Sequence, residues 1–392
     1  MLSSFRNRLP HYFTTHPSRE VKEVYWFTII SNMALSMVFI FEPIYLYTLG
    51  YSLTKIMVFY LLVYSSYLFL ITFGAKFAGR FGYKHAIFLS NIFFVAYWFT
   101  LYGIKFHPWL FFVSPIFFAM QKSLFWPAYD ADIALFSAKG QRGREVGMLT
   151  SLVQIAFIAG PLVGGMISEK FGFMVLFIAS SALIMLSTYP LFSSPEIYSP
   201  HQFTFGKLLE MLRKYRSNFF GYWGFAEDLM IMSLWPVYMF MVIGNFENIG
   251  IVSTIATVIG TVVMLYVGRL IDKQGGRHRI IFESSVVYAA TWILRFLSQG
   301  VALVLGFDIL TKALKNILNV PINSLTYENA STDGPDHAVA YSVFFEFSLA
   351  VGKVITSLAS ILILSLTNNI YLVFAFAGIL TMFYGFLRKH AQ

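Results

Sequence analysis

The chain has 392 residues, of which 57% are hydrophobic and only 12% are charged, and its mean hydropathy is +0.67. One soluble core cannot hide so much apolar surface, so this composition excludes an ordinary soluble protein and indicates a chain that lies in a bilayer. The sequence contains no cysteine, which excludes disulfides, thiolate metal sites and cysteine nucleophiles.

Apolar stretches long enough to cross about 30 Å of hydrocarbon follow one another along the chain. We expect a first set of six membrane-spanning helices at residues 24–49, 53–79, 85–104, 108–136, 145–168 and 172–192. A second set of six is expected at residues 218–243, 249–271, 279–299, 301–327, 338–366 and 369–387. The polar segment 1–23 precedes a first span that is too long for a signal peptide and carries Glu42, so we expect it to stay attached.

The two sets of spans resemble two copies of one unit. The segment from Gly268 to Arg277 recurs in weaker form from Ala75 to Lys84, and the same shift along the chain pairs Lys122 with Lys315. Between the sets, residues 193–217 break the apolar pattern with prolines and a basic stretch, as a linker does. The sequence therefore predicts an all-α membrane protein in which residues 1–192 and 218–392 form two pseudo-symmetric six-helix bundles, twelve transmembrane helices in total.

Lysine and arginine are unevenly divided between the two sides of the predicted membrane. The loops of one side hold only Lys55, Lys105 and Lys170, whereas the other basic residues outside the spans gather on the opposite side. Because basic loops stay in the cytoplasm, we expect both termini and the linker there, in a multi-pass protein of the cell membrane, inner or plasma. This asymmetry explains the net charge of +9, so we expect anionic membrane lipid, and no nucleic acid, as a partner.

Motifs of enzyme chemistry are missing from the sequence. It contains no HExxH pair, and Gly352-Lys353-Val354 lacks the upstream glycine and the following Ser or Thr of a phosphate-binding loop. We therefore expect no enzymatic activity, no cofactor and no metal.

Charged residues inside the predicted spans are the strongest functional signal. A charge at the bilayer centre costs roughly 2.5–3.5 kcal/mol on insertion scales, so such residues are retained where they face water or one another. Asp308, Lys312, Lys315 and Asn319 recur at spacings of three or four and so lie on one helical face. The complete set of candidates for the substrate and proton pathway is Glu42, Lys122, Glu227, Asp228, Asp308, Lys312, Lys315, Asn319, Glu346 and Lys353. The alternative is a buried structural ion-pair network that binds no ligand.

Two other groups of residues within the spans receive a different interpretation. Glu283 and Arg295 lie near opposite ends of the ninth span, where long side chains can reach the membrane surface, and we expect both outside the pathway. Most aromatic residues, among them the run Tyr60, Tyr64 and Tyr67, are expected to face lipid or its interface.

The loop after the eighth span carries a recognisable pattern of glycines and charges. Gly268, Asp272, Lys273, Gly275 and Arg277 stand at the spacing of the loop that marks the major facilitator superfamily, and with the twelve spans and the central linker the chain resembles that family over nearly its whole length. The resemblance implies that this loop latches the cytoplasmic face, with ordinary turn chemistry as the alternative. It also implies a cavity lined by the first, fourth, seventh and tenth spans.

The copy after the second span departs from this pattern, because Gly79 stands where the family has an acid. Arg80 in that loop, and Asp132 near the end of the fourth span, are gating candidates by the same resemblance. In the fifth span, Gly147, Gly160, Pro161, Gly164 and Gly165 resemble the motif of exporters that exchange protons for drugs, although Ala156 replaces one of its glycines. Helix packing by small residues is the alternative explanation.

These observations predict a secondary active transporter that works by alternating access. The favoured hypothesis is proton-coupled export of a small amphipathic molecule by a monomer, in which buried acids take up and release the proton. One alternative keeps the fold but assigns an anionic metabolite, held by lysines, as the substrate. A non-transporting membrane receptor or scaffold is an alternative of another class, against which the intramembrane charges argue.

Overall fold

The computed structural model describes residues 19–136, 142–196, 203–271, 277–330 and 335–389, and all regular structure in those ranges is helical. The helices of the first half are α2 (Arg19–Val38), α3 (Phe41–Thr48), α4 (Leu53–Phe81), α5 (Tyr83–Gly103), α6 (Leu110–Phe136) and α7 (Arg142–Leu191). They are followed by α8 (Phe205–Lys214), α9 (Arg216–Gly221), η2 (Tyr222–Ala226), α10 (Glu227–Met232), α11 (Leu234–Ile243) and α12 (Phe246–Ile271). The last are α13 (Arg277–Ile293), η3 (Leu294–Leu297), α14 (Val301–Ala330), α15 (Pro335–Thr367), α16 (Ile370–Thr381) and η4 (Met382–Phe386).

Helices occupy all twelve predicted spans within these ranges. The long helix α7 covers two of the spans, and the two parts meet at Gly172, whose φ of 80° interrupts the helix. Eight of the described helical segments are long and apolar enough to cross a membrane on composition alone, and one of them, Ser151–Leu191, contains both parts of α7. The predicted all-α membrane class is therefore confirmed.

The predicted linker 193–217 contains a short amphipathic helix. Thr204 begins α8 by accepting a hydrogen bond from the backbone N–H of Lys207, and Leu208 and Met211 form its buried face. This helix packs on α15 of the second half.

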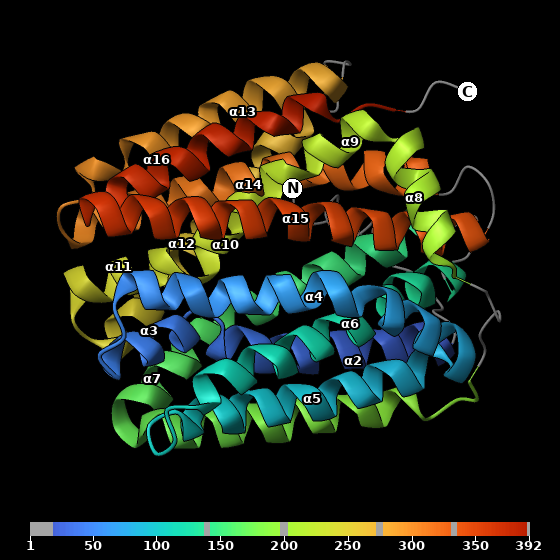
Figure 1. The fold of residues 1–392 in the computed structure, drawn as a ribbon, viewed down its shortest axis with the longest axis horizontal. Coiled ribbons are helices and arrows are strands. Elements are labelled where there is room, and N and C mark those ends of the chain that lie inside the picture. Colours follow the sequence, from blue (N-terminus) through green and yellow to red (C-terminus); the bar gives the residue numbers. More distant parts are fainter. Residues whose placement is uncertain (1–18, 137–141, 197–202, 272–276, 331–334, 390–392) are drawn as a thin grey trace, which may run out of the picture.

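Helices from the two halves of the chain gather separately in Figure 1, the first half in blue to green and the second in yellow to red. In the first half α2 packs on α7, while α4 and α5 pack on α6. In the second half α13 packs on α14 and α16, and α12 packs on α14. The two halves meet along two long pairs of helices, α4 with α15 and α7 with α12.

Two local features explain how the chain turns and breaks near the charged residues. Gly82 joins α4 directly to α5 with a φ of 98°, a conformation that favours glycine. Ser233 separates α10 from α11 three residues before Pro236, because a proline ring excludes the carbonyl of the residue four positions earlier from normal helical bonding. The break leaves the carbonyl of Met232 without its helical donor.

Candidate functional site

The first ion-pair group lies in the interior of the second half. Lys315 of α14 contacts Glu227 at 2.5 Å and Asp228 at 2.8 Å, both at the start of α10. The hydroxyl of Tyr384 donates to Glu227 and accepts from Lys315 at 3.0 Å. Glu227 is completely buried. Lys315 thus has two carboxylate partners, so a change in the charge of one acid would leave it paired with the other.

A second ion pair lies in α14, one turn before Lys315. Lys312 contacts Asp308 at 2.7 Å, as residues four apart on a helix can. The same ammonium group donates to the backbone oxygen and the hydroxyl of Ser253 in α12, at 2.8 and 2.7 Å. The other oxygen of Asp308 accepts the indole N–H of Trp235 at 2.9 Å. This group therefore links α14 to both α11 and α12.

Arg295 differs from the expectation that it would reach the membrane surface, because the side chain is completely buried. Its guanidinium carbon lies 3.3 Å from the ring centre of Trp292 and 3.9 Å from that of Trp235. The position near the end of the ninth span did not reveal this burial, since a long side chain there can also reach the membrane surface. By contrast, Glu283 is exposed and pairs with Arg279 at the surface.

Glu42 is buried in the first half. Among the described residues, no lysine lies within ion-pair distance of its carboxylate. Its two oxygens accept from the Tyr97 hydroxyl at 3.1 Å and from the Trp98 indole at 2.7 Å. Two aromatic donors thus replace a counter-charge, as a buried carboxyl group requires.

Lys122 of α6 is half-buried beside aromatic rings. Its ammonium nitrogen lies 4.9 Å from the ring centre of Phe118 and 5.8 Å from that of Tyr64. No carboxylate lies within 4.0 Å of it in the part of the chain that the structure describes. Its predicted counterpart Lys315, with two acids in contact, therefore has different surroundings.

Three tyrosines on one face of α4 contribute to the contact between the halves. This position differs from the expectation that their rings face lipid. Tyr60, Tyr64 and Tyr67 are all buried. Tyr60 donates to the backbone oxygen of Met232 at 2.9 Å, and Tyr67 donates to Glu346 of α15 at 2.9 Å. Their spacing of three and four residues places them on one face of α4, a signal that could have identified them.

Two candidate residues on α14 and α15 complete the group. Lys353 of α15 is buried, with its ammonium nitrogen 3.4 Å from the Tyr64 hydroxyl and 5.0 Å from the centre of that ring. Asn319 follows Lys315 by one turn, and its side-chain oxygen is buried without a hydrogen-bond partner among the described residues. Glu346 and Lys353 of α15 thus meet the tyrosines of α4 across the contact between the halves, whereas Lys315 and its acids lie within the second half.

The gating candidates of the first loop lie at the end of α4. Arg80 is exposed, with its guanidinium 5.3 Å from the ring centre of Phe81. Lys84, at the end of the same loop pattern, is buried and pairs with Glu23 of α2 at 3.2 Å. Glu196 of the linker accepts from the backbone N–H of Lys84 at 3.1 Å. Acids from two other segments thus meet this loop, whose own acid position is occupied by Gly79.

The remaining gating candidates lie wholly or partly outside the description. Asp272, Lys273 and Gly275 lie outside the described residues. Gly268 belongs to α12, Arg277 begins α13 and Asp132 belongs to α6, but the side-chain surroundings of these three positions lie outside the description as well, as do those of Gly147 in α7.

The small residues of α7 pack against two other helices. A Cβ atom at Gly160 would collide with Ser36 of α2, and one at Gly164 would collide with the backbone oxygen of Met37. Gly165 faces Phe246 and Gly250 of α12, which belongs to the other half. Pro161 belongs to the same contact between α7 and α12, because its carbonyl oxygen packs against Gly250. These residues therefore allow the backbones of α2, α7 and α12 to approach closely.

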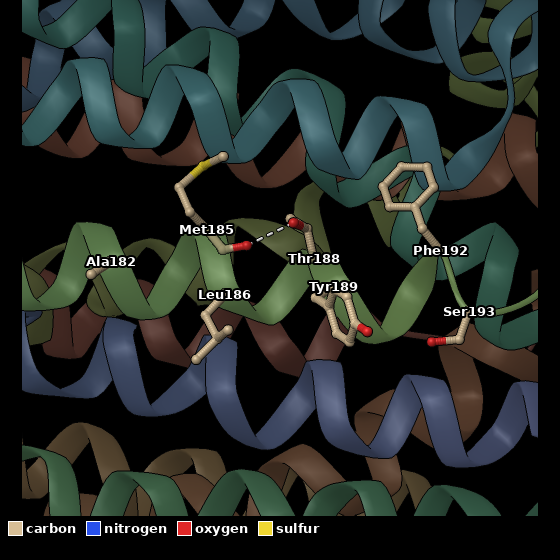
Figure 2. A pocket seen from close by; sticks show the side chains of 7 residues that line it. All are labelled: Ala182, Met185, Leu186, Thr188, Tyr189, Phe192 and Ser193. Carbon is tan, nitrogen blue, oxygen red and sulfur yellow. Dashed lines mark hydrogen bonds between the residues drawn. The ribbon is translucent and has the colours of Figure 1, made fainter.

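A surface groove of about 600 Å³ lies apart from the charged group. Figure 2 shows its lining side chains on the last turns of α7 and in the two residues that follow it. On α7, Thr188 donates to the backbone oxygen of Met185 at 2.7 Å. Leu186 and Tyr189 are largely exposed there. None of the described residues that line the groove is charged, and none of them belongs to the ion pairs. No group of three histidine or carboxylate side chains that could hold a metal occurs among the described residues.

Comparison with known proteins identifies the class to which this fold and its charged interior belong. The family model described as Major Facilitator Superfamily matches residues 24–345. The chain therefore belongs to the major facilitator superfamily, as its sequence pattern predicted. It is a multi-pass membrane transporter and not an enzyme.

One curated relative is Multidrug resistance protein 2 of Bacillus subtilis (strain 168). It is 24% identical over 279 residues, which cover 62% of this chain and 66% of the relative. The chain thus spans just under two thirds of the length of that relative.

Solved structures of two transporters are similar in fold. A D-xylose–proton symporter superposes with a TM-score of 0.70 at 12% identity, covering 95% of this chain and 99% of that one. The nucleoside transporter NupG has a TM-score of 0.69 at 14% identity, with 93% and 98% covered. At these identities the likeness establishes the fold alone.

Proposed function

We propose that this chain is a proton-coupled exporter of a small amphipathic molecule, which works by alternating access between its two halves. Residues 1–192 and 218–392 act as the two moving bundles, and the cytoplasmic linker 193–217 joins them. In this proposal the monomer lies in the cell membrane with both termini in the cytoplasm. The contacts along α4–α15 and α7–α12 support it, because these are the surfaces that must separate and close in turn.

The observation that carries the proposal is the pairing of the buried charges in the second half. Lys315 is balanced by Glu227 and Asp228, and Lys312 is balanced by Asp308. These lysines therefore need no anionic substrate as a counter-charge. A neutral or cationic amphipathic molecule fits this interior, and its apolar part can pack on the tyrosines of α4.

Protonation of a paired acid gives the coupling step. When Glu227 takes up a proton, it loses its charge attraction to Lys315, and the ammonium group keeps only Asp228 as an ionic partner. The buried contacts at α10 and α14 then differ between the protonated and ionised states. A difference of this kind between two conformations is what a bound proton needs in order to shift their populations.

The similarity to a multidrug resistance protein and the glycines of α7 support export of the substrate in exchange for proton entry. Gly160 and Gly164 pack on α2, while Gly165 packs on α12 of the other half. A helix in contact with both halves is well placed to respond when they move.

Lys122 favours a second candidate function, transport of an anionic metabolite. It lies among aromatic rings with no carboxylate within 4.0 Å among the described residues. A carboxylate or phosphate of a substrate would give Lys122 a direct ionic partner.

Uptake into proteoliposomes distinguishes these proposals. The purified chain is reconstituted into vesicles with and without a pH gradient. Transport is measured for three probes that share a naphthalene ring but differ in charge: the cation naphthylmethylammonium, the neutral naphthylmethanol and the anion naphthoate. Transport of the cation or the alcohol driven by the gradient supports the proposed exporter. Transport of naphthoate alone, lost in Lys122→Gln, would establish the anion transporter instead. Absence of any gradient-driven flux for all three probes would contradict proton-coupled transport of this class of molecule.

A further inference from the structure

We propose that Arg295 is a positioning residue that acts on Asp308 through Trp235. This inference rests on the proposed place of Asp308 in the transport pathway. Arg295 is completely buried, and two of its nitrogens, Nε and Nη1, have no hydrogen-bond partner among the described residues. A guanidinium buried within a membrane span is costly, so the chain must compensate its charge by other contacts.

The compensation comes from two indole rings. The guanidinium lies between Trp292 and Trp235, with its carbon 3.3 and 3.9 Å from the ring centres. Cations attract the faces of aromatic rings, most strongly where water is excluded. The two contacts therefore hold the guanidinium of Arg295 in place over the ring of Trp235.

Trp235 transmits this orientation to Asp308. One face of the indole contacts Arg295, and its N–H donates to Oδ1 of Asp308 at 2.9 Å. The second oxygen, Oδ2, is then directed to Lys312 at 2.7 Å. Arg295 also donates to the Thr311 hydroxyl at 2.5 Å, one turn further along α14. Arg295 therefore contacts α14 and the indole that binds Asp308.

The same series of contacts extends to the contact between α12 and α7, where the two halves meet. Lys312, held by Asp308, donates to Ser253 of α12. The next residue, Thr254, donates to the backbone oxygen of Ile158 in α7 at 2.8 Å. Arg295 thus determines, through Trp235 and Asp308, how firmly Lys312 holds the helix that meets the first half.

A double-mutant cycle tests this role in the full-length chain. We expect Arg295→Gln and Asp308→Asn each to lower the transport rate about tenfold. The double variant should transport no more slowly than the slower of the two single variants, because the effects of substitutions in one network are not additive. Trp235→Phe keeps an aromatic face but loses the N–H, so it should lower transport to the same extent as Arg295→Gln. Arg295→Lys keeps the charge and should recover part of the rate. Arg279→Gln is the control, because Arg279 is an exposed arginine of α13, the helix just before η3, and this variant should transport like the unchanged chain.

A second measurement needs no substrate. Since the chain has no cysteine, Val252→Cys supplies a single labelling site beside Ser253. The rate at which this cysteine reacts with a maleimide reports the exposure of α12. Arg295→Gln and Trp235→Phe should both raise that rate, and adding either to Asp308→Asn should raise it no further. Independent effects that multiply in the double variants, in transport or in labelling, would overturn the positioning role. If the unchanged chain shows no transport while the variants show the expected labelling pattern, only the proposed function is overturned.

Discussion

Tyr60 of α4 donates its hydroxyl to the backbone oxygen of Met232 at 2.9 Å, across the contact between the two halves. Met232 stands four residues before Pro236, the position whose carbonyl a proline leaves without its helical donor. A tyrosine of one half thus satisfies a carbonyl that a proline of the other half has freed. The break between α10 and α11 is thereby a point of contact between the halves as well as a local irregularity.

This relationship predicts that Tyr60→Phe weakens the contact. The free carbonyl of Met232 would stay buried without a donor, at a cost of about 1–3 kcal/mol. The expected result is a lower thermal unfolding midpoint of the purified protein in detergent. In a Pro236→Ala background, the restored N–H can serve Met232, so Tyr60→Phe should cost much less there. Equal costs in both backgrounds would show that the proline and the tyrosine are unrelated.

The proposed coupling predicts separate roles for Glu227 and Glu283. Glu227→Gln removes one carboxylate from Lys315 and leaves Asp228 as its ionic partner, so the chain should still exchange substrate between equal concentrations. It should no longer concentrate substrate when a pH gradient is applied, because the proton site is lost. Measurements of exchange and of gradient-driven uptake in the same vesicles separate these steps. The matched control is Glu283→Gln, an exposed acid paired with Arg279. If Glu227→Gln still concentrates substrate, another acid carries the proton.

Close packing at Gly164 predicts that even one methyl group is too large. Gly164→Ala would place a Cβ against the backbone oxygen of Met37, and overpacking of this kind costs about 1–3 kcal/mol. A lower thermal midpoint is expected, together with slower transport. Gly306→Ala is the control, since a Cβ at Gly306 of α14 would meet no atom within 4 Å. Equal stability of both variants would remove the packing explanation of the α7 motif.

The sequence predicted the twelve spans and the family because both depend on long apolar stretches and on the spacing of glycines and charges within a short loop. The buried acids and lysines of the spans were predicted for a similar reason, since charge in a membrane interior is costly wherever it lies. Their partners could not be predicted. Lys315 with Glu227, and Tyr67 with Glu346, join residues far apart in the chain, and nothing in a single sequence indicates which helices come together.

Arg295 and Tyr60 were misjudged for a physical reason. Both residue types are common at membrane surfaces, where a long or amphipathic side chain has its polar end in water. Whether such a residue turns inward depends on the rotation of its helix, which packing against neighbouring helices determines. Trp235 and Trp292 provide the buried faces that retain Arg295, and their positions are known only from the fold.

The pair Glu23 and Lys84 predicts how the first loop is held in the absence of its family acid. Both side chains are buried, and Lys84 also donates to the Ser194 hydroxyl at 2.8 Å, so three separate segments depend on one ammonium group. Lys84→Met would leave the buried Glu23 with the exposed Arg19, at 3.4 Å, as its ionic partner among the described residues. The cost should therefore fall below the roughly 3–5 kcal/mol of a fully unpaired buried charge, and Lys84→Met with Glu23→Gln should recover most of that loss. Thermal unfolding of the two variants in detergent measures the difference. Lys55→Met, at an exposed position on α4, should leave the midpoint unchanged. A double variant as unstable as Lys84→Met alone would mean that the lysine acts through Ser194 and the linker rather than through its charge partner in α2.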